Sequence, residues 1–212
     1  MIDIVFDISH HNPTVDFVSA AQAGMVGVVH KATEGLTNTD LLYAGRKSEA
    51  LAAGLLWGAY HFGHNDDGAA QAKYFLGVVQ PGPTDLLVLD FESNAGMTTG
   101  QAEAFVQYVY QQTGRYPGLY TSTGYLQQQG ATTSHSLHKC WLWLAEYNSV
   151  ISAPKCPPGW PNPWTMWQYT ETGGVPGVIG NCDRDRFNGT ADRLRLLWGA
   201  PVVTVADPVL KA

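Results

Sequence analysis

Short apolar runs alternate along the chain with longer segments in which apolar residues recur at helical spacing. This alternation is typical of βα units built around a parallel sheet. Five runs are predicted to be strands: Ile4–Ser9, Val26–Ala32, Leu56–Phe62, Leu86–Glu92 and Gly118–Ser122. Four segments between them are predicted to be helices: Asp16–Ala23, Asp40–Ala53, Gly68–Val79 and Gln101–Thr113. Gly24, Gly54 and Gly114 each follow a predicted helix, at the position where a left-handed cap is favoured.

The rhythm changes in the last third of the chain. After a short helical piece near Gly124–Gln129, strand-like runs follow without room for full helices, at Cys140–Tyr147, Trp164–Tyr169 and Gly180–Arg184. Roughly eight strands, about five of them followed by helices, predict a single α/β domain. We expect a (β/α)-type barrel, a modified TIM barrel, with an irregular and partly antiparallel last third. Residues 1–199 are assigned to this barrel and residues 200–212 to a C-terminal tail.

Composition narrows the choice of partner. The chain has 212 residues, 45% of them hydrophobic and 14% charged, and a net charge of −6 without a basic stripe. Nucleic acid is therefore not an expected partner. No apolar stretch approaches the roughly 18 residues that span a bilayer, and the first residues lack the pattern of a secretory signal, so we expect no membrane insertion. The seven Trp and ten Tyr suit a carbohydrate ligand, because aromatic faces pack on sugar rings.

Neither the cysteines nor the adjacent histidines have the spacing of a metal site. Cys140, Cys156 and Cys182 allow one disulfide with a free thiol, or three unpaired thiols, and both remain open. His10 and His11 would point to opposite sides of an extended chain, and no third ligand is apparent. We therefore expect neither a metal ion nor a cofactor, and we expect a monomer.

Polar side chains gather at the ends of the predicted strands, where the working groups of parallel barrels lie. They are Asp7, Ser9, Lys31, Glu34, Tyr60, Asp90, Glu92, Tyr120, Tyr147, Gln168, Tyr169 and Asp183. One such residue would mean little, but the repetition predicts a cleft.

Two carboxylates end the most apolar strand, Leu86–Glu92. Asp90 and Glu92 are two residues apart and therefore face the same side. Like-charge repulsion and burial should raise the pKa of at least one of them. Glycoside hydrolysis needs such a pair, one carboxyl protonated and one ionised. The alternatives are a structural ion pair with Lys31 or Arg186 and a divalent-metal site.

These motifs together resemble the lysozymes of glycoside hydrolase family 25, over about Ile4 to Gly189 and in the same order. The motifs are Asp7-Ile8-Ser9, Lys31-Ala32-Thr33-Glu34-Gly35, Gly58-Ala59-Tyr60-His61-Phe62, Asp90-Phe91-Glu92, Leu142-Trp143-Leu144-Ala145, Trp167-Gln168-Tyr169 and Asp183 with Phe187. The resemblance implies a flattened barrel and cleavage of the β-1,4 bond between N-acetylmuramic acid and N-acetylglucosamine in bacterial peptidoglycan, with retention. It also implies that the enzyme acts on the cell wall.

By position in those motifs, Glu92 would be the general acid and base. Asp90 would stabilise the transition state or orient the substrate's 2-acetamido group, and Asp7 and Asp183 would support them. Asp185, of the same strand parity as Asp183, is the weaker candidate for the last position. Substrate binding is expected from Tyr60, Lys31, Glu34, Phe62, Tyr120, Tyr147, Gln168 and Tyr169. Trp143 and Trp167 are expected to pack in the barrel.

Three other functions fit parts of the pattern. A glycosidase acting on chitin or another N-acetylhexosamine polymer would use the same carboxylate pair, and only its products would distinguish it. A non-catalytic glycan-binding module could use acidic side chains to bind sugar hydroxyls, but it would not need four converging carboxylates. A metal-dependent hydrolase would be sensitive to chelators.

Overall fold

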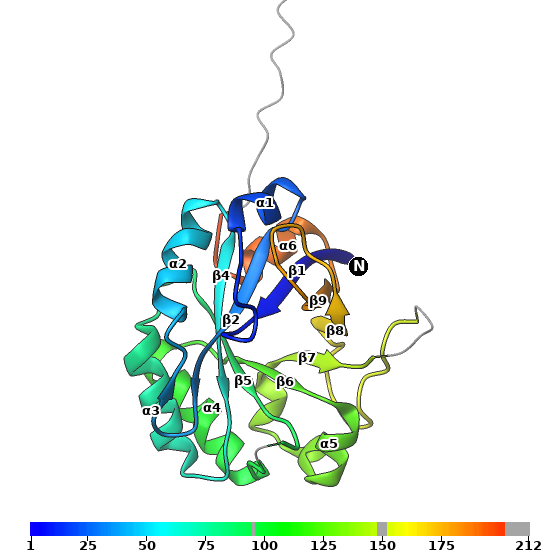
Figure 1. Cartoon of the computed structure of the whole chain (residues 1–212). Coiled ribbons are helices and arrows are strands. Elements are labelled where there is room, and N and C mark those ends of the chain that lie inside the picture. The colour runs from blue at the N-terminus through cyan, green and yellow to red at the C-terminus, as the bar shows by residue number, and fades with distance from the viewer. Residues whose placement is uncertain (95, 148–151, 202–212) are drawn as a thin grey trace, which may run out of the picture.

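Eight strands close into a barrel in the computed structural model, which describes residues 1–94, 96–147 and 152–201 (Figure 1). Around the barrel they are β1 (Ile2–Ile8), β9 (Cys182–Phe187), β8 (Met166–Gly173), β7 (Trp141–Ala145), β6 (Gly118–Thr121), β5 (Leu86–Asp90), β4 (Leu56–Phe62) and β2 (Gly27–Glu34). Pairing of β1 with β2 completes the circle. The predicted barrel of strands and helices is thereby confirmed.

Only β9 runs against its neighbours among the eight barrel strands described. It pairs antiparallel with β1 and with β8, whereas the other pairs are parallel. The prediction of a partly antiparallel last third is thus confirmed, and the antiparallel part is β9. A two-residue strand that the sequence did not indicate, β3 (Asn38–Thr39), folds back on the end of β2.

Helices cover the outside of the first part of the barrel (Figure 1). They are α1 (Phe17–Gln22), α2 (Tyr43–Ala52), α3 (Gly68–Val79), α4 (Thr99–Thr113) and α5 (Thr123–Gln128), followed by the short 3₁₀ turns η1 (Ala131–Thr133) and η2 (Leu137–Lys139). Thr98 and Gln101 form a capping box at the start of α4. Gly114 ends that helix in the left-handed region, at φ 71°.

A sixth helix, α6 (Ala191–Leu197), was not predicted. It lies against the amino ends of the barrel strands. Leu194 and the following Trp198 are fully buried there, and the indole Nε1 of Trp198 donates to the carbonyl of Trp57 at 3.0 Å. The predicted boundary of the barrel at residue 199 remains a prediction, because residues 202–212 lie outside the described part of the chain.

Strand alternation separates two apolar layers. One set of side chains, including Val5, Val29, Val88 and Met166, fills the barrel interior. The other set, including Phe6, Trp57 and Leu89, packs beneath the helices. At the carboxyl end of the strands, the inward positions change from apolar to polar. This change of side chains along the same face creates the site described below.

The described residues contain neither a disulfide bond nor a helix that could span a membrane. Cys140, Cys156 and Cys182 are all unpaired thiols. None of the described helices combines the length and the apolar character that crossing a bilayer requires.

Candidate active site

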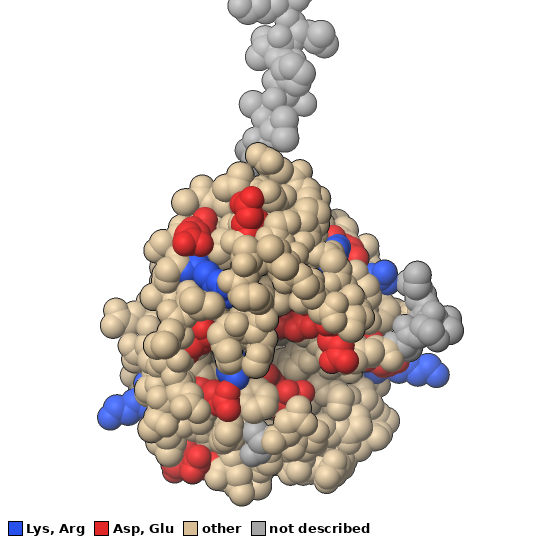
Figure 2. Space-filling model, in the orientation of Figure 1, with Lys and Arg blue, Asp and Glu red and all other residues tan. Residues whose placement is uncertain are grey.

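A cavity of about 400 Å³ opens at the carboxyl end of the barrel strands. It is lined by Asp7, Ser9, His11, Lys31, Glu34, Tyr60, Phe62, Asp90, Glu92, Asn94, Tyr120, Trp143, Tyr147, Gln168, Glu171 and Asp183. Figure 2 shows a hollow in this face of the molecule with acidic side chains around it. All four predicted catalytic carboxyls line the cavity, and so does every predicted substrate-binding residue except Tyr169.

Tyr169 lies outside the cavity, which corrects the sequence prediction. On β8 it follows Gln168, which points inward, so strand alternation turns Tyr169 to the outer face. There its hydroxyl donates to Asp3 at 2.6 Å, and the guanidinium of Arg186 lies 4.3 Å from its ring centre.

Five lining residues were not assigned to the site from the sequence. Ser9 and His11 belong to the segment that follows β1, and their place after a strand end was the available signal. Trp143, expected only to pack, is buried and also lines the cavity. Asn94 and Glu171 are exposed residues at the rim, and no pattern in the sequence distinguished them from ordinary surface residues.

Asp90 and Glu92 meet at the end of β5. Asp90 is buried, and its Oδ1 has no hydrogen-bond donor among the described residues. Burial raises the pKa of Asp90 well above its usual range, and the charges of Glu92 and Asp7 raise it further. Burial likewise raises the pKa of Glu92, although Lys31 opposes this shift. A buried oxygen without a donor is uncommon and is available to a ligand.

The cation nearest to this pair is engaged elsewhere. The ammonium of Lys31 pairs with Glu34, whose carboxylate also accepts from His64 Nε2 at 3.0 Å. Arg186 is paired with Asp3, at 3.9 Å. Within the described part of the chain, neither Asp90 nor Glu92 forms an ion pair with either cation, so the structural ion-pair alternative has no support.

The cavity floor is a hydrogen-bonded chain that joins three strands. Gln168 on β8 donates through Nε2 to Asp7 on β1 at 2.7 Å. Its Oε1 accepts from the hydroxyls of Tyr120, at 2.6 Å, and of Tyr147. Because two hydroxyls occupy the amide oxygen, the amide nitrogen faces Asp7. The chain fixes Asp7 from one side.

On the other side of Asp7 lies β9. Asp183 stands directly opposite Asp7 in the β1–β9 register. Burial, followed by the charge of Asp7, raises the pKa of Asp183 to about 9. Asp183 lines the cavity and Asp185 does not, which agrees with the preference for Asp183.

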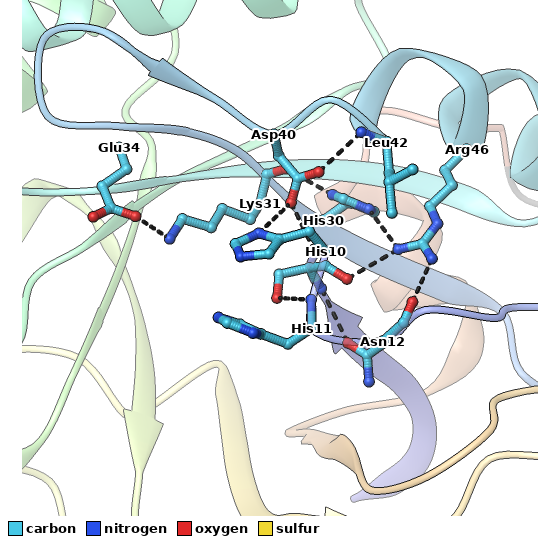
Figure 3. A network of polar contacts seen from close by, with 10 residues as sticks. His10, His11, Asn12, His30, Lys31, Glu34, Asp40, Leu42 and Arg46 are labelled. Atoms are coloured by element: carbon cyan, nitrogen blue, oxygen red, sulfur yellow. Dashed lines mark hydrogen bonds and ion pairs between the residues drawn. The ribbon is translucent and has the colours of Figure 1, made fainter.

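A second polar network holds the segment after β1 in place (Figure 3). Arg46 on α2 is buried and donates to the carbonyls of Ser9, at 2.9 Å, and Asn12. Asp40 accepts from the backbone N–H of His10 at 2.8 Å and contacts its ring nitrogen at 3.2 Å. The ring of His10 contacts Asp40 and also lies beside the ring of His11, with the ring centres 4.1 Å apart, so the expectation that these two side chains point to opposite sides was wrong. The described residues contain no group of three or more His, Cys, Asp or Glu suited to a metal ion.

Stability should fall as the pH rises from about 4 to about 9, and Asp183→Asn should remove much of this slope. A carboxyl whose pKa rises from about 4 in the unfolded chain to about 9 when folded keeps its proton only in the folded state. Its stabilising contribution is complete below pH 4 and is lost as the pH rises toward 9. Unfolding temperatures of both proteins across this range test the expectation. An equal slope in the folded variant would contradict it.

A barrel with paired carboxyls of raised pKa at the end of a strand has the arrangement of a glycoside hydrolase. Residues 6–178 match the sequence model of glycosyl hydrolases family 25, and the chain belongs to this family. The resemblance noted in the sequence is thereby confirmed, and the chain is a glycoside hydrolase.

Relatives of known name agree with this assignment. Lysozyme M1 of Streptomyces globisporus is 34% identical over 90% of this chain and 69% of its own length. The crystal structure of a bacterial lysozyme from Streptomyces coelicolor superposes with a TM-score of 0.82, at 34% identity over 91% of this chain and 94% of that one. A family GH25 lysozyme from Aspergillus fumigatus gives a TM-score of 0.81 at 33% identity, over 92% and 99% of the two chains.

Proposed function

We propose that the protein is a lysozyme that hydrolyses the β-1,4 bond between N-acetylmuramic acid and N-acetylglucosamine in bacterial peptidoglycan, with retention at the anomeric carbon. The observation that carries the proposal is the pair Asp90 and Glu92, which face one cavity with raised pKa values. The names of the relatives, lysozyme and muramidase, support the choice of substrate.

Glu92 acts as the general acid in this proposal. It is half-buried, and burial raises its pKa, which favours the protonated form that can donate to the leaving oxygen. After the bond has broken, the same carboxylate accepts a proton from the attacking water. Retention follows when a nucleophile first displaces the leaving group and water then displaces the nucleophile.

Asp90 acts on the anomeric centre. Its free Oδ1 can stabilise the positive charge that develops at the sugar, or accept the N–H of a 2-acetamido group and orient that group as internal nucleophile. Asp7 and Asp183 support Asp90 from the cavity floor. Tyr60, which is half-buried and lines the cavity with Asp7 and Asp90, hydrogen-bonds the reacting sugar or one of these carboxyls.

The remaining residues of the cavity bind the glycan strand. Lys31, Glu34 and Gln168 offer hydrogen-bonding groups, while Phe62, Tyr120 and Tyr147 offer ring surface for the sugars. We propose that the protein works as a monomer on the cell wall and that a glycan strand of peptidoglycan is its partner.

Mass spectrometry of purified peptidoglycan after digestion tests the proposal. We expect fragments that carry N-acetylmuramic acid at each new reducing end. N-acetylglucosamine at the new reducing ends would show that the enzyme cleaves the other glycosidic bond and is a glucosaminidase. Cleavage of chitin at a rate comparable to that of peptidoglycan would support the wider N-acetylhexosamine specificity. Binding to cell walls without any new reducing end would indicate a glycan-binding module.

A further inference from the structure

Asp185 lies directly beneath the cavity floor, and the proposed mechanism gives it no role. It is 0% exposed, and its Oδ1 accepts the indole N–H of Trp143 at 2.8 Å. Its Oδ2 is buried and receives no N–H or hydroxyl donor from the described residues. A carboxylate oxygen in that position is costly unless a proton lies between it and a neighbouring acceptor.

The neighbouring acceptor is the carboxyl of Asp7. In the β1–β9 register, Asp183 stands opposite Asp7 and Asp185 stands opposite Val5, so all three aspartates point into the barrel. Asp7 is within hydrogen-bonding contact of both Asp183 and Asp185. Two carboxyls can form such a bond only if one of them carries a proton.

We propose that Asp185 is a positioning residue for Asp7: one proton is shared between their two carboxyls, and the indole of Trp143 holds Asp185 from the far side. The shared proton limits the negative charge on Asp7. Gln168 completes the arrangement by donating to Oδ2 of Asp7. This inference concerns the state of the floor beneath the proposed catalytic pair and deepens the proposed function.

In the trio of Asp7, Asp183 and Asp185, the pKa of Asp183 is raised to about 9, so Asp183 carries a proton of its own at neutral pH. Four acidic groups act on the trio from neighbouring elements, namely Asp3, Asp90, Glu92 and Glu171. Tyr60, Tyr120, Tyr147 and Cys182 also face it, and their protons are held more tightly because of burial. Arg184 and Arg186 turn to the outer face of β9, where Asp3 is their described partner. Burial raises the pKa of both Asp7 and Asp185, and the charge of Asp185 raises that of Asp7 further.

The shared proton affects the reaction because it changes how easily Asp90 ionises. The charge of Asp7 raises the pKa of Asp90. With Asp7 neutralised through Asp185, Asp90 ionises more easily and can face the positive charge at the sugar while Glu92 keeps its proton. Asp185, which does not touch the substrate, thus favours the ionised form of Asp90 and leaves the proton on Glu92.

Titration of the Asp7 carboxyl by ¹³C NMR, in protein labelled at the aspartate side chains, tests this inference. Asp185→Asn keeps the shape, accepts from Trp143 and offers Asp7 an N–H in place of a shared proton. We expect the pKa of Asp7 to fall by about one unit or more. Asp192→Asn, a change of the same kind at an exposed position of α6, should leave the pKa of Asp7 in place. An unchanged Asp7 titration in folded Asp185→Asn, or an equal shift in Asp192→Asn, would overturn the inference.

A second measurement does not depend on how Asp185→Asn folds. In a background of Asp183→Asn and Asp90→Asn at pH 7, one aspartate carboxyl should still be protonated, and its resonance should disappear when Asp7 is also replaced by Asn. A spectrum in which every aspartate is ionised at that pH would overturn the inference. Neither measurement uses a substrate, so the outcome is independent of whether peptidoglycan is cleaved.

Discussion

Replacing Glu92 by Gln is expected to lower kcat for peptidoglycan by about 10²- to 10⁴-fold, the usual contribution of a general acid. The amide retains the volume and polarity of the side chain but has no proton to give to a leaving oxygen. Because Glu92 is half-buried at the cavity and forms no ion pair among the described residues, the fold should be unaffected. Release of reducing ends from purified peptidoglycan measures the loss.

Glu49→Gln is the matched control for this variant. Glu49 is exposed on α2 and does not line the cavity, so the same chemical change there should leave kcat within about twofold of the wild type, as for ordinary surface substitutions. If Glu92→Gln had the wild-type unfolding temperature and most of the wild-type activity, Glu92 would not be the proton donor.

Replacing Asp90 by Asn is expected to lower kcat by about 10²- to 10³-fold, the range seen when one electrostatic contact to a transition state is removed. KM should change far less, because the lost interaction strengthens only when positive charge develops at the sugar. The side chain is buried with one oxygen free, so the isosteric amide fits the same space. Steady-state rates on soluble peptidoglycan fragments separate the two constants.

The unfolding temperature of Asp90→Asn tests separately whether Asp90 has a catalytic or a structural role. Burial disfavours the ionised form of Asp90, so the neutral amide should be at least as stable as the wild type above neutral pH. A loss of activity that came with a large loss of stability would point to a structural role for Asp90 instead. Asp192→Asn, on exposed α6, is the control for the substitution itself.

The barrel was predictable because its strands are apolar and its helices have recognisable capping residues at their ends. The run from Leu86 to Asp90 is buried throughout, and the capping box at Thr98 is present as read from the sequence. In contrast, α6 has only one buried residue, Leu194, within its seven positions, so hydrophobic periodicity could not reveal it. The pairing of β3 involves two exposed residues and leaves no pattern at all.

The site residues were predictable where the alternation of side chains along a strand decides which of them face the cavity. Asp90 and Glu92 share a face, and Asp7, Asp183 and Gln168 follow the same rule on their strands. Tyr169 was wrongly placed because a motif was read as a block, although adjacent residues of a strand face opposite ways. Asn94 reaches the rim from the segment after β5, and Glu171 lies in β8 within a shift of its register with β9; neither feature is encoded in single-residue patterns.

The pairing of the first barrel strand with the last has a consequence for how the protein is made. Asp7 and Asp183 face each other across β1 and β9, so nearly the whole barrel sequence separates two halves of one cavity floor. Chains emerge from the ribosome with their amino-terminal part first, and contacts this distant in sequence form late. The cavity is therefore incomplete until β9 has been made, and a growing chain holds Asp90 and Glu92 without the floor beneath them. We expect an enzyme that attacks a structural polymer to remain inactive until the whole barrel has been synthesised.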